Sequence, residues 1–166
     1  MKRHRVVLLI GGNMGDRLLY LNQAVARLNE DFQLIKKSGI YETEAWGGNS
    51  TGNYLNQALL MHTEFTPDQV LKIIHDIEDG LDRKRDKRWG NRTMDIDIIY
   101  FDDLVLSTPL LQIPHPFLQE RRFVLLPLVE IIPAYIHPIL QVSQLELLAG
   151  IKDSSAVKKW SEGTNT

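Results

Sequence analysis

The chain of 166 residues has no cysteine, so disulfide bonds and thiolate metal sites are excluded. A reducing cytoplasm is therefore the expected location. No run approaches the roughly 20 apolar residues that a membrane-spanning helix needs, and no membrane association is expected. The N-terminus, MKRHRVVLLIGGN, starts with basic residues, but its apolar run is only about five residues long. It predicts a first strand rather than a signal peptide.

A large excess of charge is also missing, because the formal net charge is only −2. Such a chain has no general attraction for phosphate polymers, so no nucleic-acid partner is expected. With 43% hydrophobic and 24% charged residues, the composition is that of an ordinary globular protein. The length suits a single domain over residues 1–166, and the polar residues 152–166 are expected to fray.

Apolar runs separated by turn signals predict the order of the elements. Strands are predicted at 5–10, 33–43, 54–65 and 94–101, and helices at 17–30, 66–80 and near 120–131. The first six of these elements follow the order β-α-β-β-α-β. This order predicts an α+β fold of the ferredoxin-like type, a mostly antiparallel sheet with helices on one face, followed by a C-terminal extension.

Capping residues mark the helix boundaries. Asp16 is placed to cap the first helix. Thr66 precedes Pro67 and is followed three residues later by Gln69, which is the capping-box pattern. Gly80 is expected to end the second helix.

Two acids lie inside the predicted strand MDIDIIYF. Residues i and i+2 of a strand point the same way, roughly 6.5–7 Å apart, so Asp95 and Asp97 should share one face. Strand alternation assigns Ile99 and Phe101 to that face as well, and Ile96, Ile98 and Tyr100 to the other. Two close carboxylates repel each other unless a cation lies between them, and Mg²⁺ favours such oxygen ligands. The alternative is that both acids pair with nearby arginines.

A cluster of cations leads into this strand. Residues 83–92 contain six of them, namely Arg83, Lys84, Arg85, Lys87, Arg88 and Arg92. Arginine binds phosphate bidentately, so metal-binding acids beside arginines indicate phosphoryl transfer. A solvated surface is the alternative, although Trp89 inside the cluster argues against it. The glycines of GGNMGD match no phosphate-binding loop.

Weaker signals come from two pairs of residues. Tyr54 and Asn56 share a strand face near Trp46, an arrangement that can stack a flat heterocycle and bind its edge. A core tyrosine beside an unrelated amide is the alternative. His75 and Glu78 lie one helical turn apart, and as a bare pair they indicate a surface contact.

Taken together, these motifs resemble one family. They are YETEAWG, YLNQAL, IEDGLDRKRDKRWGNRTMDIDI and IPHPFLQERRFVLLPLVEIIP, followed by HP, within residues 6–138. The family that they resemble is 6-hydroxymethyl-7,8-dihydropterin pyrophosphokinase, an ATP- and Mg²⁺-dependent enzyme of folate biosynthesis with a ferredoxin-like fold. The resemblance implies transfer of pyrophosphate from ATP to the pterin, with AMP as the second product. We expect small-molecule substrates and a monomer.

The resemblance also implies roles for particular residues. Asp95 and Asp97 would hold two Mg²⁺ ions, and Arg83 and Arg92 would contact the phosphates, so these four are the expected catalytic residues. The expected ATP-binding residues are His75, Glu78, Arg85, Trp89, Arg92, Ile98, Leu111, His115 and Arg121. The expected pterin-binding residues are Thr43, Trp46, Tyr54, Asn56 and Phe123.

Several positions depart from the pattern of this family. They are Ala45, Asp82 and Asn91 in the two loops, His75 in the second helix, and Arg122, where a small residue is usual.

Three alternative functions of the chain also remain. A nucleotidyltransferase usually has Gly-Ser before its acids, which RWGNRT lacks. A non-catalytic ferredoxin-like binding module leaves the two acids unexplained, and only an assay excludes an inactive family member.

Overall fold

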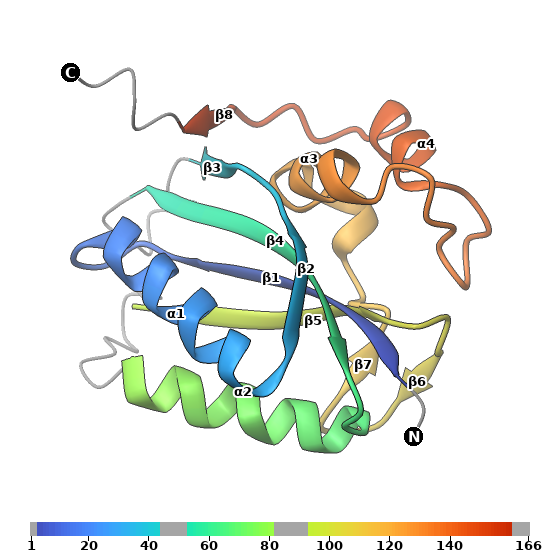
Figure 1. The fold of residues 1–166 in the computed structure, drawn as a ribbon. Coiled ribbons are helices and arrows are strands. Elements are labelled where there is room, and N and C mark those ends of the chain that lie inside the picture. The colour runs from blue at the N-terminus through green and yellow to red at the C-terminus, as the bar shows by residue number, and fades with distance from the viewer. Residues whose placement is uncertain (1–2, 44–52, 82–92, 161–166) are drawn as a thin grey trace.

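The structure, a computed structural model, describes residues 3–43, 53–81 and 93–160 (Figure 1). The strands are β1 (His4–Gly12), β2 (Gln33–Lys37), β3 (Ile40–Thr43), β4 (Tyr54–Thr63), β5 (Asp95–Phe101), β6 (Leu106–Ser107), β7 (Gln112–Ile113) and β8 (Val157–Trp160). The helices are α1 (Arg17–Asp31), α2 (Pro67–Leu81), the 3₁₀ helix η1 (Leu118–Glu120), α3 (Arg122–Ile131) and α4 (Gln144–Ala149). Among the described residues, no helix is both long and apolar enough to cross a membrane.

One six-stranded sheet organises the fold. Its strand order is β5-β1-β4-β3-β8, and β2 also pairs with β4. Every pairing in this sheet is antiparallel. Helix α1 connects β1 to β2 and helix α2 connects β4 to β5, and in both cases the two strands are not neighbours in the sheet. This arrangement confirms the predicted ferredoxin-like α+β fold.

Both faces of the sheet are covered. On one face, α1 and α2 pack on β1 through buried residues such as Leu21, Ile74 and Leu8. On the other face, α3 packs through Leu125 and Leu128, and α4 lies beside α3 (Figure 1). The prediction of helices on one face therefore holds for the core, and the C-terminal extension supplies the second layer.

The predicted helix starts are confirmed. The Asp16 carboxylate accepts a hydrogen bond from the Leu19 N–H, at 3.1 Å. Thr66 and Gln69 form the reciprocal capping box, with distances of 2.9 and 3.3 Å. The predicted end at Gly80 differs slightly, because α2 includes this glycine and continues to Leu81.

The face assignment of β5 is correct as far as Ile99. The pairing of β1 with β5 shifts register between Val7 and Leu8, opposite Tyr100 and Ile98. Ile99 is the extra residue of this bulge, and an extra residue reverses the alternation that follows it. Ile99 and Tyr100 consequently pack on the α3 side, whereas Phe101 packs with α1 and α2. The predicted faces of Tyr100 and Phe101 were therefore wrong.

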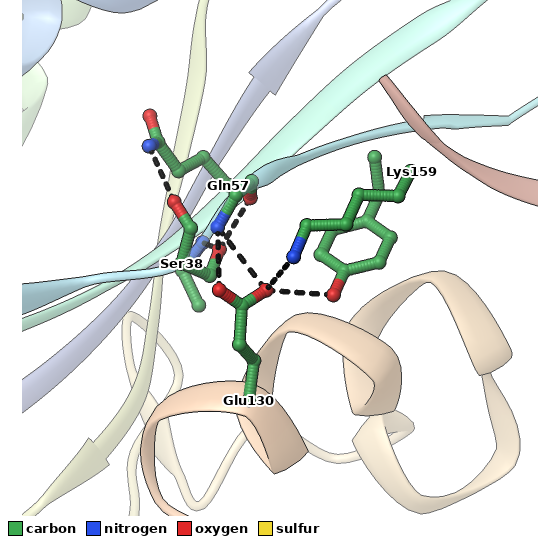
Figure 2. A network of polar contacts seen from close by, with 7 residues as sticks. Ser38, Gln57, Glu130 and Lys159 are labelled. Carbon is green, nitrogen blue, oxygen red and sulfur yellow. Dashed lines mark hydrogen bonds and ion pairs between the residues drawn. The ribbon is translucent and has the colours of Figure 1, made fainter. Parts of the chain in front are cut away.

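The predicted strand 33–43 is divided into β2 and β3 by a polar connection. The Ser38 hydroxyl accepts from the Ala58 N–H at 2.9 Å, and the Gln57 side chain donates to the Ser38 carbonyl at 2.7 Å (Figure 2). The Gly39 N–H donates to the Glu130 carboxylate of α3. Side chains thus satisfy backbone groups that a continuous strand would have paired.

Glu130 joins three elements at this connection (Figure 2). Its carboxylate accepts from the Tyr41 hydroxyl at 2.7 Å and lies 3.5 Å from the Lys159 ammonium. Burial opposes ionisation of Glu130, but the hydrogen bonds from Tyr41 and Gly39 and the nearby Lys159 together outweigh it and lower its pKa. Burial, together with Glu130, raises the pKa of Tyr41. The network ties β3 to α3 and to β8, where the sequence predicts a frayed tail.

Candidate active site

A cavity of about 700 Å³ lies between the sheet and the start of α3. It is lined by Leu9, Gly11, Thr43, Tyr54, Asn56, Asp95, Asp97, Phe117, Glu120, Arg121, Phe123, Lys152, Asp153 and Ser155. The lining combines carboxylates, cations and aromatic rings. Its size suits a small-molecule substrate.

Strand register places the polar residues of this cavity beside one another. Asp95 is opposite Gly11 on β1, and Gly11 is opposite Asn56 on β4. Directly opposed residues of antiparallel strands share a face. Because Gly11 has no side chain, the Asn56 side chain can lie close over β1 at this position.

Gly11 tolerates no larger side chain. A Cβ atom at this position would lie 2.6 Å from the Leu55 carbonyl oxygen and closer still to the Asn56 amide oxygen. We expect Gly11→Ala to destabilise the protein by about 1–3 kcal/mol, as overpacking does, and to displace the Asn56 side chain. Urea unfolding and the pterin KM measure the two effects.

Gly150→Ala is the matched control for this substitution. There the new Cβ would meet its nearest neighbour, the Glu146 carbonyl oxygen, at 3.7 Å, which is an ordinary contact. If Gly11→Ala has the same stability and the same pterin KM as the wild type, the close approach of β1 to β4 contributes to neither.

The two acids at the start of β5 face the cavity, as predicted. Asp97 is half-buried and paired with Leu9, whereas Asp95 is exposed. Within the described residues, no group of three or more His, Cys, Asp or Glu side chains is placed to hold a metal. Two carboxylates nevertheless fit Mg²⁺, which keeps waters and substrate phosphates as its other ligands.

Glu78 stabilises this strand instead of lining the cavity. It is buried in α2, and its carboxylate accepts a hydrogen bond from the Ile96 N–H at 2.7 Å. Ile96 lies between Asp95 and Asp97, so this bond holds the backbone segment that carries both acids.

The pterin-binding residues predicted within the described chain come together. Thr43, Tyr54, Asn56 and Phe123 all line the cavity. The Thr43 hydroxyl is buried and has no hydrogen-bond partner among the described residues. A buried hydroxyl without a partner is unfavourable, so a polar ligand group bound beside it would be stabilising.

Arg121 lies close to two aromatic rings. Its guanidinium carbon lies 5.7 Å from the centre of the Phe117 ring and 6.0 Å from that of Phe123. Both distances suit cation–π contacts, which orient the guanidinium at the cavity. Phe117 was not among the residues predicted to be functional.

His115 lies nearby but does not line the cavity. It is half-buried, and its backbone N–H donates to the Ile99 carbonyl at 3.1 Å. Burial lowers the pKa of His115, and the charge of Arg121 lowers it further. The charge of Asp95 raises this pKa but has the smallest effect of the three. The imidazole is therefore neutral near pH 7.

Three other predicted ATP-binding residues lie away from the cavity. Ile98 and Leu111 are buried in the core formed with α1 and α2, and His75 is exposed on α2. The remaining predictions, together with three of the noted departures, fall outside the described residues: Ala45, Trp46, Asp82, Arg83, Arg85, Trp89, Asn91 and Arg92.

Comparisons with known proteins agree with the sequence resemblance. Residues 7–133 match the model of the family "7,8-dihydro-6-hydroxymethylpterin-pyrophosphokinase". A 2-amino-4-hydroxy-6-hydroxymethyldihydropteridine pyrophosphokinase from Aquifex aeolicus is 43% identical over 134 residues, covering 81% of this chain and 84% of that protein. The Bacillus subtilis protein of the same name is 37% identical over 155 residues, covering 92% and 88%.

Solved structures show the same fold. The Plasmodium falciparum HPPK-DHPS wild type with pteroate has a TM-score of 0.72 and 18% identity to this chain. The likeness covers 89% of this chain but only 42% of the Plasmodium chain. At this identity the likeness concerns the fold alone.

Proposed function

The chain belongs to the 7,8-dihydro-6-hydroxymethylpterin-pyrophosphokinase family, and we propose that the cavity between its sheet and α3 is the active site. Membership implies transfer of pyrophosphate from ATP to 6-hydroxymethyl-7,8-dihydropterin in folate biosynthesis. One observation carries the assignment of the site. The same cavity is lined by the carboxylates of Asp95 and Asp97, the guanidinium of Arg121, and groups suited to a flat heterocycle.

The heterocycle-binding end is formed by β3, β4 and α3. Tyr54 and Phe123 offer aromatic faces for stacking the pterin. Asn56 can both donate to and accept from the pterin edge, and the Thr43 hydroxyl is buried without a partner among the described residues. Stacking and edge contacts together would select a flat, polar bicyclic ring.

The phosphate-binding end is formed by β5 and the start of α3. Asp95 and Asp97 would hold Mg²⁺, for which we propose two ions, as the resemblance implies. Bound Mg²⁺ neutralises phosphate charge and orients the attacking and leaving oxygens. Arg121 adds a fixed positive charge, and Arg83 and Arg92, which lie outside the described residues, are proposed as further phosphate ligands.

The transfer replaces one phosphorus–oxygen bond with another. The hydroxymethyl oxygen of the pterin bonds to the β-phosphorus and releases its proton to solvent. The bond from that phosphorus to the oxygen bridging the α-phosphorus breaks, and its electron pair leaves with AMP. Such a reaction needs mainly positioning and charge stabilisation, which the rigid strand β5 and the oriented Arg121 supply.

We also propose that the enzyme acts as a cytoplasmic monomer on small molecules, without a nucleic-acid partner. The lack of cysteine supports the cytoplasmic location. The net charge of −2 supports the absence of a nucleic-acid partner.

A direct assay tests the proposed function. Purified protein is incubated with Mg²⁺ and ATP, with and without 6-hydroxymethyl-7,8-dihydropterin, and AMP is measured. We expect AMP release that depends on both the pterin and Mg²⁺. Release without the pterin, or no release at all, would refute the assignment.

A further inference from the structure

A segment without regular secondary structure forms one wall of the cavity. Residues 151–156, here called the C-terminal strap, run from α4 to β8 (Figure 1). Both ends are attached, because the Ile151 N–H donates to the Leu148 carbonyl and β8 pairs with β3. Lys152, Asp153 and Ser155 of the strap line the cavity.

Asp153 caps helix α3, although it lies far from this helix in the sequence. The residue at the N-cap position, Arg121, makes no side-chain capping bond. The Asp153 carboxylate accepts from the Arg122 N–H at 2.9 Å, although the two residues are 31 positions apart. This bond is the main reason that the pKa of Asp153 is lowered. A carboxylate is stabilising at the positive end of a helix dipole.

The same carboxylate also shapes the strap. Its second oxygen accepts from the Ser155 N–H at 2.9 Å, which folds the strap around Asp153. The Arg122 guanidinium donates to the Ser155 carbonyl at 3.1 Å and so adds a second tie between strap and helix. Arg122, which departs from the family pattern, therefore has a structural role in this chain.

The start of α3 carries two side chains of the proposed active site. Arg121 and Phe123 flank the capped residue Arg122, and both line the cavity. A capped first turn fixes the direction in which these side chains leave the backbone. We propose that Asp153 is a positioning residue, which holds Arg121 and Phe123 toward the cavity and keeps the strap as its wall. This inference rests on the proposed function of the cavity.

Kinetics of Asp153→Ala test the proposal. We expect the KM values for the pterin and for ATP to rise about fivefold each, an effect of about 1 kcal/mol per ligand. Asp153→Asn keeps one acceptor oxygen for the Arg122 N–H, so its KM values should fall between those of wild type and Asp153→Ala.

Ser143→Ala is the matched control, because Ser143 caps α4 through an equivalent bond to the Glu146 N–H and does not line the cavity. Urea unfolding should show that both alanine variants lose stability, whereas only Asp153→Ala changes the KM values. Wild-type KM values in Asp153→Ala, or equal changes in Ser143→Ala, would overturn the positioning role.

Failure of the underlying function has a different signature. If the wild-type protein releases no AMP in response to the pterin, the proposed function itself is refuted. If wild type is active and Phe123→Ala raises the pterin KM while Asp153→Ala does not, the cavity assignment stands and only the positioning role fails.

Discussion

Asp97→Ala is expected to lower kcat by roughly 10²–10³-fold, the usual loss when one group that stabilises transition-state charge is removed. The KM for the pterin should change much less, because Asp97 is proposed to hold metal and phosphate rather than the ring. Steady-state kinetics with each substrate varied in turn separate the two effects.

The position of Asp97 explains the size of this effect. Asp97 lies within β5, where it is paired with Leu9 of β1 and half-buried. The strand is also held from the other side by the bond between Glu78 and the Ile96 N–H. A carboxylate on such a rigid element needs little reorganisation to hold a cation.

Two further variants identify the property of Asp97 that matters. Asp97→Asn keeps the shape but removes the charge, so it should lose nearly as much turnover as Asp97→Ala and require more Mg²⁺ for half-maximal rate. Asp103→Ala removes an exposed acid from the turn after β5 and should behave as wild type. If Asp97→Ala instead abolishes binding of free pterin without metal, its role lies in ring binding and the proposal is wrong.

The parts of this molecule that could be predicted from sequence depend on residues close together in the chain. Capping at Asp16 and Thr66 involves partners three residues away, so the helix starts follow from local pattern. The shared face of Asp95 and Asp97 likewise depends only on a two-residue period. The ferredoxin-like fold class followed from the succession of elements, because few topologies suit that succession.

The parts that could not be predicted depend on contacts between distant segments. The bulge at Ile99 reflects register against β1, and no local signal in MDIDIIYF marks it. The division between β2 and β3 depends on Glu130, which is 91 positions from Gly39. Phe117 and the strap reach the cavity only through the packing of the C-terminal extension, so no local pattern predicts their place in the site.

Phe123→Ala is expected to weaken pterin binding roughly 10–100-fold, because aromatic stacking on a flat nucleobase contributes roughly 1–3 kcal/mol by alanine substitution and a pterin has a comparable ring. Calorimetry measures this directly when the pterin is titrated into enzyme holding Mg²⁺ and an ATP analogue with a methylene group between the α- and β-phosphorus atoms. That analogue lacks the bond that the reaction breaks, so binding is observed without turnover.

Stacking must be distinguished from simple burial, because Phe123 also packs against the α3-side core. Phe123→Leu keeps an apolar side chain without a flat face, whereas Phe123→Tyr keeps the ring. If stacking is responsible, the leucine variant should bind the pterin almost as weakly as the alanine variant, and the tyrosine variant should bind within about threefold of wild type. Recovery of affinity by leucine would assign the effect to burial, and unchanged affinity in Phe123→Ala would remove Phe123 from the pterin site.

The Phe123 ring also lies 6.0 Å from the Arg121 guanidinium. A rise in the ATP KM of the alanine and leucine variants, but not of the tyrosine variant, would show that the same ring orients the phosphate-binding end.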